Sequence, residues 1–290
     1  MAKSSNSQGP LVWVVTGASS GIGKAIAQAA VATEDAIVYA IGRDLETLKP
    51  LAEVGCRITR LDVAEPFDVA QTAVAKIEEE AGRIDVLVNA AGYLLEGGVE
   101  ETSEHETDHV FQTNVFGPLR LIRAALPSMR RRRSGVIINI CGVATYNGSP
   151  NAGPYCATKS ALSALTESLQ RETESLGVHV CLAQLGHFRT PFLTDGHRRH
   201  VEHPIPDYSE ALEPLRKAFN GLNGAQPGNP VQAAKLLVEL AGRRGGAEKP
   251  IPKFLPLGSD VIPAMRTAYE QRVDEAQRWE QLTISTDLVV

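Results

Sequence analysis

Residues 11–23 read LVWVVTGASSGIG, an apolar run that passes without a break into a glycine-rich loop. Five consecutive apolar residues are typical of a strand buried on both faces of a sheet. Glycines at the GxxxGxG spacing let the backbone turn sharply and approach a pyrophosphate, and the helix that follows offers its first N–H groups to the phosphate charge. The stretch therefore predicts a strand, a dinucleotide-binding loop and a helix. The loop residues expected to contact the dinucleotide are Gly17, Ser19, Ser20, Gly21, Ile22 and Gly23.

Strand-length apolar runs alternate with longer segments of helical period up to about residue 182. The expected strands are residues 11–15, 36–41, 57–61, 86–89, 136–140 and 178–182, and the expected helices are residues 21–32, 45–53, 67–81, 106–132 and 155–175. Runs that are apolar on both faces belong to parallel sheets covered on both sides. The pattern predicts an α/β fold: a single-domain, Rossmann-like, doubly wound parallel sheet with helices on both faces.

The remaining segments fit one domain over residues 11–290, preceded by a flexible N-terminus at residues 1–10. Residues 191–230 are rich in His, Pro and Gly, and we expect them to form a lid inserted over the substrate. Helices are expected at residues 231–242 and 264–281, with a last strand within residues 251–257.

Composition excludes several classes of function. The chain has 290 residues, 43% of them hydrophobic and 22% charged, which fits one soluble globular domain. Its net charge of −5 gives no footprint for nucleic acid, and no apolar run is long enough to cross a membrane. The polar start lacks the apolar core of a secretory signal. Four cysteines without metal-ligand spacing predict reduced thiols, a cytoplasmic location and no metal site.

The end of the second expected strand indicates which nicotinamide cofactor binds. NAD sites usually place Asp or Glu there to accept from the ribose hydroxyls, whereas Arg accommodates the 2′-phosphate of NADP. The strand here ends Ile41-Gly42-Arg43-Asp44, with Gly42 where the acid is expected and Arg43 beside it. The pattern favours NADP(H), and a shift of one place would instead bring Asp44 into range.

Six motifs in order resemble the short-chain dehydrogenase/reductase family, over residues 11 to about 190. Residues 16–23 match TGxxxGxG, Asp62 begins the acid–apolar pair near the adenine, and residues 89–92 (NAAG) resemble NNAG. Residues 155–159 (YCATK) match YxxxK, and residues 186–190 (GHFRT) resemble the PGxxxT segment, with Leu185 for its proline. The resemblance implies a nicotinamide-dependent oxidoreductase acting on a small molecule. Besides the loop and Arg43, it assigns to cofactor binding Asp62, Asn89, Arg123, Tyr155, Lys159, Phe188 and Thr190.

The resemblance also implies the catalytic residues Asn114, Tyr155 and Lys159. Tyr155 can supply a proton, but the pKa of a free phenol is about 10. Lys159 is one helical turn away on the same face, and its ammonium group favours the phenolate and lowers that pKa. In the family the lysine also bonds the nicotinamide ribose, and the asparagine supports a proton relay through water.

One catalytic group of the family is missing. The family pattern Asn-Ile-Ser-Ser precedes the tyrosine, and ungapped alignment places Gly142 on its second, catalytic serine. Losing one such hydrogen-bond donor typically costs about 10²- to 10³-fold in rate. Four explanations of the missing serine hydroxyl compete. A neighbouring side chain can replace it, or the substrate can be reactive enough to do without it. Alternatively, the reaction is redox-neutral, or the protein is a weak enzyme. The candidate replacements are Cys141, Thr145, Tyr146, Asn147, Ser149 and His187.

The preferred hypothesis is NADP(H)-dependent reduction of a ketone or aldehyde, or oxidation of the matching alcohol, on a medium-sized apolar molecule. One rival is a redox-neutral isomerase, cyclase or dehydratase that uses Tyr155 and Lys159 as acid and base. The other is a non-catalytic NADP(H)-binding scaffold. Because the family is often dimeric or tetrameric, the resemblance implies a homo-oligomer. The apolar residues expected to line the substrate pocket are Phe188, Phe192, Leu193 and Phe219.

Overall fold

A central parallel sheet of seven strands organises the computed structural model, which describes residues 9–242 and 251–288. The strand order is β3-β2-β1-β4-β6-β7-β9, so the predicted doubly wound sheet is confirmed. Most of the expected flexible N-terminus, residues 1–8, lies outside the described residues. The strands are β1 (Leu11–Val15), β2 (Ala36–Gly42), β3 (Arg57–Arg60), β4 (Val86–Asn89), β6 (Gly135–Gly142), β7 (Val178–Leu185) and β9 (Phe254–Leu257).

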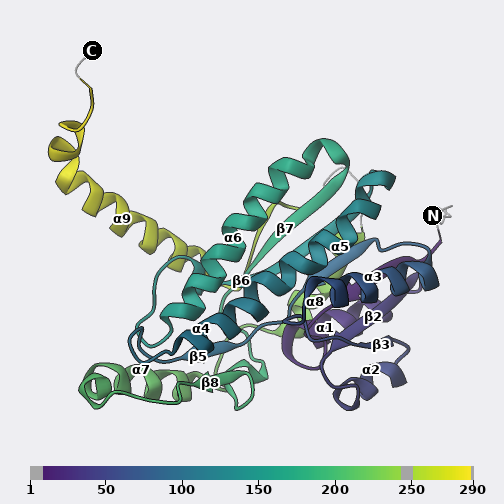
Figure 1. Ribbon diagram of the computed structural model, residues 1–290, viewed down its shortest axis with the longest axis horizontal. Helices are drawn as coiled ribbons and strands as arrows, with labels where there is room; N and C mark the ends of the chain where they lie inside the picture. Colours follow the sequence, from purple (N-terminus) through teal and green to yellow (C-terminus); the bar gives the residue numbers. More distant parts are fainter. Residues whose placement is uncertain (1–8, 243–250, 289–290) are drawn as a thin grey trace.

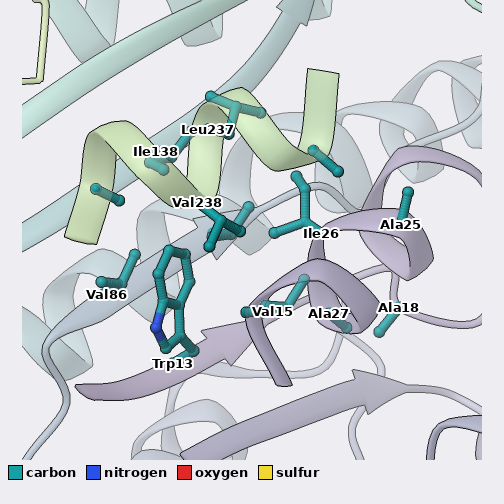
Figure 2. Close-up of a cluster of buried hydrophobic side chains, with 14 of the residues drawn as sticks. Trp13, Val15, Ala18, Ala25, Ile26, Ala27, Val86, Ile138, Leu237 and Val238 are labelled. Carbon is teal, nitrogen blue, oxygen red and sulfur yellow. The ribbon is translucent and has the colours of Figure 1, made fainter. Parts of the chain in front are cut away.

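Helices cover both faces of this sheet (Figure 1). Alternate residues of β1 divide between two cores: Trp13 faces the layer that holds α1 and α8, and Val14 faces the layer that holds α3 and α5. Figure 2 shows Leu237 and Val238 of α8 close to Ile26 of α1 above the Trp13 ring. The helices of these layers are α1 (Gly21–Val31), α2 (Lys49–Glu53), α3 (Phe67–Ala81), α5 (Gly117–Arg132), α6 (Gly153–Thr173) and α8 (Pro230–Gly242).

The single helix expected at residues 106–132 is interrupted. It consists of α4 (Glu104–Phe111), a π-helical turn over Gln112–Phe116, and α5. A π turn inserts one extra residue into a helix, often at a functional site. Here it contains Asn114, whose side chain is completely buried and bonded to the neighbouring chain segment. No local sequence pattern predicted this π-helical turn.

A second, two-stranded sheet ties residues 191–230 to the body of the molecule. β5 (Leu94–Glu96) pairs in parallel with β8 (Arg198–His200), and neither three-residue strand was expected. Buried Glu96 forms an ion pair with buried Arg198, and Asn151 donates to the second Glu96 oxygen at 2.7 Å. The helix α7 (Ser209–Leu222) completes the segment beside β8 (Figure 1).

The C-terminal helix α9 (Val261–Ile284) extends away from the sheet and its helices (Figure 1). It is longer at both ends than the helix expected at residues 264–281. Three of its large side chains, Tyr269, Val273 and Trp279, are more than half exposed. Within residues 9–242 and 251–288, no helix combines the length and apolarity required to span a bilayer.

The packing of α8 on α1 predicts a measurable asymmetry between two adjacent leucines. Leu237 is fully buried in the α1–α8 core, so Leu237→Ala is expected to lower the free energy of unfolding by about 2–5 kcal/mol. Leu236 on the same helix is 39% exposed, and Leu236→Ala is expected to cost less than about 1 kcal/mol. Urea unfolding followed by circular dichroism measures both, and equal losses would contradict this packing.

Candidate active site

A cavity of about 580 Å³ opens at the carboxyl ends of the central strands. Its walls come from the glycine-rich loop after β1, the segments after β2 and β4, the end of β6, the start of α6, and residues 185–200. The chain reverses its direction of winding between β1 and β4, and ligands of open parallel sheets bind at such switch points. The topology therefore produces this cavity.

The glycine-rich loop has the shape that its sequence predicts. Gly17 has φ +62°, and a Cβ there would lie 2.8 Å from the backbone of Ala91. A Cβ on Gly23 would lie 2.5 Å from the carbonyl oxygen of Gly17. Only glycine allows this close packing, which aims the first turn of α1 at the cavity. A bare loop backbone beside a helix N-terminus fits the pyrophosphate of a dinucleotide. The loop residues that line the cavity are Gly17, Ser19, Ser20, Gly21, Ile22 and Gly23.

At the end of β2, Arg43 lines the cavity and Asp44 does not. Arg43 lines the cavity and forms no ion pair with any residue in the described ranges. The carboxylate of Asp44 instead accepts a hydrogen bond of 2.9 Å from the backbone N–H of Glu46, outside the cavity. Asp62 also lines the cavity, and its carboxylate accepts from the backbone N–H of Ala64 at 3.0 Å.

Tyr155 and Lys159 face the cavity from the first two turns of α6. The Nζ atom of Lys159 donates to the carbonyl oxygen of Ile140 at 3.1 Å, which holds the buried amine against the end of β6. The same Nζ lies 5.9 Å from the centroid of the Tyr155 ring. The ring of Phe192 lies on another side of Tyr155, with 6.0 Å between the centroids.

Burial is the largest influence on the pKa values of Tyr155 and Lys159. It raises the pKa of the Tyr155 phenol above its ordinary value, and the nearby thiols of Cys156 and Cys141 add to the rise. The expected lowering by Lys159 is therefore not found in this arrangement. Burial also lowers the pKa of Lys159 itself, against the opposing effect of Cys141. The phenol thus stays protonated through neutral pH, the form that donates a proton.

Asn114 does not itself line the cavity but forms hydrogen bonds with residues beside it. Its amide nitrogen donates to the carbonyl of Tyr93 at 3.0 Å and to the Thr158 hydroxyl at 3.1 Å, while its oxygen accepts from the Tyr93 N–H at 3.1 Å. A Cβ on Gly92 would meet the Asn114 oxygen at 3.0 Å and the Lys159 Nζ at 3.6 Å. The bare backbone of Gly92 therefore separates Asn114 from Lys159.

The family model described as short chain dehydrogenase matches residues 11–199, which contain the loop, Asn114, Tyr155 and Lys159. The chain belongs to the short-chain dehydrogenase family. The curated 3-ketodihydrosphingosine reductase of Bacteroides thetaiotaomicron is 36% identical over 204 residues, 70% of this chain and 73% of that protein.

Two solved structures extend this likeness to the fold. The crystal structure of a short-chain dehydrogenase from Streptomyces avermitilis matches with a TM-score of 0.85 at 36% identity, covering 96% of this chain and 100% of that one. An alcohol dehydrogenase from Thermococcus sibiricus, complexed with 5-hydroxy-NADP, matches with a TM-score of 0.67 at 25% identity, covering 87% and 97%.

In this short-chain dehydrogenase, Gly142 ends β6 at the wall of the cavity. Of the candidate donors, Thr145 and Tyr146 do not line the cavity, and the Thr145 hydroxyl donates to the Gly142 carbonyl at 2.8 Å. The thiol of Cys141 points toward the Lys159 carbonyl, 3.7 Å away. Three candidates with stronger donors line the cavity: Asn147, Ser149 and His187.

His187 is the most firmly held of these three. Asp260 accepts from its backbone N–H at 2.9 Å and lies 2.7 Å from its ring Nδ1. These two contacts fix the imidazole at the cavity wall, and they lower the pKa of Asp260 against the effect of its partial burial.

The other end of the cavity is apolar. All four residues expected there line it, and Phe192, Leu193 and Phe219 pack in one cluster with Leu94, Ala152 and Tyr155. The fourth, Phe188, packs against the α1–α8 core instead. Thr190, expected at the nicotinamide, also lines the cavity.

Two residues expected to bind the cofactor do not reach the cavity. Arg123 lies exposed on α5, whose buried face carries Leu121, Ile122 and Ala125 instead. Asn89 is buried below the cavity, where its amide donates to Asn139 at 2.8 Å. Conversely, Arg199 and Tyr93 line the cavity and were not expected. Short strands carry too few residues to show a period, so the sequence held no signal for Arg199.

The crowding at Gly23 predicts a loss of dinucleotide binding in Gly23→Ala. The added Cβ forces the loop to move away from α1, and we expect at least about a tenfold weaker Kd. Gly221→Ala is the matched control, because no atom lies within 4 Å of its Cβ and alanine favours the helix. Fluorescence titration with NADPH and NADH measures both variants. Unchanged binding by Gly23→Ala would contradict the role of this loop.

Proposed function

We propose that this short-chain dehydrogenase uses NADP(H) to reduce a ketone or aldehyde, or to oxidise the matching alcohol, on a medium-sized apolar molecule. One observation carries the proposal: Tyr155 and Lys159 line the same cavity as the dinucleotide loop. A proton donor and a cofactor loop in one cavity are what carbonyl reduction requires. The Bacteroides relative, a 3-ketodihydrosphingosine reductase, supports the same type of reaction by its name.

The preference for NADP(H) rests on the end of β2. The exposed Arg43 lines the cavity, while Asp44 is engaged with the backbone of Glu46 and Gly42 offers no acid. An unpaired guanidinium there suits a 2′-phosphate, and among the described residues at the end of β2 no carboxylate is turned toward the cavity. The neighbour from Thermococcus sibiricus, complexed with 5-hydroxy-NADP, supports this choice.

The proposed mechanism assigns each residue a limited task. When bound, the nicotinamide supplies the hydride that reaches the carbonyl carbon. Tyr155 donates its phenolic proton to the carbonyl oxygen, and the raised pKa keeps that proton in place until charge develops on the substrate. Lys159 lies beside the phenol, with its Nζ 5.9 Å from the ring centroid, and holds the end of β6 there through its bond to the Ile140 carbonyl. Asn114 holds the backbone carbonyl of Tyr93 and the hydroxyl of Thr158, which keeps the site rigid.

The proposed substrate is apolar because of the side chains around Tyr155. Phe192, Leu193 and Phe219 come from residues 191–230, which we propose to be the lid over the substrate. Burial of their rings against a bound molecule excludes water from the phenol and strengthens the charge interactions there.

A substrate panel tests the activity. Wild-type protein is expected to oxidise NADPH with apolar ketones or aldehydes, as followed by loss of its absorbance at about 340 nm. Tyr155→Phe is expected to reduce kcat by about 10²- to 10⁴-fold with little change in the Kd for NADPH, since it loses only the proton donor. Binding of NADPH without turnover would favour a redox-neutral reaction or a scaffold. Full activity of Tyr155→Phe would remove the assigned role.

Replacement of Gly142 tests the missing hydroxyl. Gly142 has extended backbone (φ −164°), and a Cβ would meet only the Leu185 carbonyl oxygen at 3.3 Å, so serine fits with a small shift. We expect Gly142→Ser to raise kcat/KM for carbonyl reduction about tenfold or more, because it restores an oxyanion donor. Gly142→Ala carries the same Cβ without the hydroxyl and is the control. Equal or lower rates for the serine variant would show that another residue already supplies the donor.

A further inference from the structure

Two adjacent arginines of the lid strand β8 have opposite environments. Arg198 is buried and pairs with Glu96 of the neighbouring strand β5. Arg199 is half-buried, lines the cavity, and forms no hydrogen bond or ion pair with the residues of the described ranges. Successive side chains of a strand point to opposite faces. The ion pair that buries Arg198 therefore directs Arg199 toward the cavity.

Arg199 is held on a rigid platform inside the cavity. Its guanidinium lies 4.6 Å from the centroid of the Tyr93 ring, a cation–π contact that leaves its N–H donors available. Tyr93 is fixed in turn by Asn114 at its backbone and by His109, 3.0 Å from its hydroxyl. The position of Arg199 is therefore set before any ligand binds.

Two arginines lie in this part of the cavity. Arg43 lines the same cavity as Arg199, and after burial the charges of Arg199, His105 and Arg43 lower the pKa of His109 while Asp62 raises it. His197, two residues before Arg199, places its Nε2 3.2 Å from the hydroxyl of Ser20 in the dinucleotide loop. Among the described residues that line the cavity, Asp62 is the single carboxylate, and it already accepts from the Ala64 backbone.

Neither arginine forms an ion pair with a carboxylate of the described residues. Arginine is the side chain best suited to phosphate, because its planar fork donates two parallel hydrogen bonds. The loop and helix α1 beside it already present N–H groups to an anion. A phosphate at this position would meet Arg43 from the body of the molecule and Arg199 from the lid.

We infer that Arg199 binds a phosphate group of the dinucleotide, opposite Arg43, and so links the lid to the cofactor. This inference rests on the proposed function, because it requires that a nicotinamide dinucleotide occupies the cavity. Two phosphates are available: the pyrophosphate, which NADPH and NADH share, and the 2′-phosphate, which NADPH alone carries. In both cases a residue of the lid strengthens cofactor binding without taking part in the chemistry.

Equilibrium binding of Arg199→Gln tests the inference. The Kd values of wild type and variant are measured by fluorescence titration with NADPH, NADH and 2′,5′-ADP. Loss of one charge-assisted contact is expected to weaken the Kd about tenfold or more. The KM for NADPH should rise in parallel with the Kd, and Arg199→Lys should recover part of the affinity because it restores the charge.

Lys217→Gln is the matched control, since it removes one positive charge from α7 of the same lid. Lys217 lies outside the cavity and pairs only with Glu213 at 3.7 Å, so its Kd values should equal those of the wild type. Thermal unfolding of both variants checks that the fold is intact, as expected from the lack of polar partners of Arg199.

The three ligands separate the outcomes. Weaker binding of both NADPH and NADH assigns Arg199 to the pyrophosphate, and weaker binding of NADPH and 2′,5′-ADP alone assigns it to the 2′-phosphate. If the wild type binds NADPH tightly and Arg199→Gln binds it equally well, the inference is wrong while the proposed function stands. If the wild type binds neither dinucleotide, both are overturned.

Discussion

The hydroxyl of Thr16 joins the two strands between which the site is built. It donates to the carbonyl of Val88 at 3.3 Å and accepts from the N–H groups of Ala90 and Ala91 at 3.1 and 3.2 Å. These bonds hold the end of β1 against the segment after β4, at the switch point of the sheet. The Thr16 hydroxyl itself is buried, so water competes little for these bonds. The close approach of Gly17 to Ala91 follows from this junction, and the loop and α1 follow from Gly17.

Polar contacts buried around the cavity fix its walls, while Arg43 and Arg199, which line it, form no ion pair with the described residues. Asn114 ties the π turn to Tyr93, and Lys159 ties α6 to the end of β6 through Ile140. Glu96 and Arg198 hold β8 against β5, where breaking a buried pair typically costs about 3–5 kcal/mol. The rigid frame explains how Arg43 and Arg199 can remain unpaired, since neither is needed to hold the fold together.

The catalytic end of the cavity combines the buried phenol of Tyr155 with a glycine, Gly142, at the position of the family's serine. Burial raises the pKa of Tyr155, and Phe192 and Phe219 keep that end apolar. Gly142 has no hydroxyl to act as the expected oxyanion donor, but the imidazole of His187, held by Asp260, lines the same cavity. The site therefore combines a phenol that stays protonated at neutral pH with apolar side chains around it.

The sequence by itself determined the sheet, the dinucleotide loop and the Tyr155–Lys159 pair, because each corresponds to a pattern of residues close together in the sequence. Buried strands, GxxxGxG and YxxxK fix backbone shape and side-chain spacing within a few residues. The tertiary structure alone decided that Asp44 turns away, that Arg123 is exposed and that a π turn buries Asn114. It also decided that Arg199 enters the cavity, through the pairing of β8 with β5 across about a hundred residues of sequence. Such contacts depend on distant partners, which no short stretch of sequence specifies.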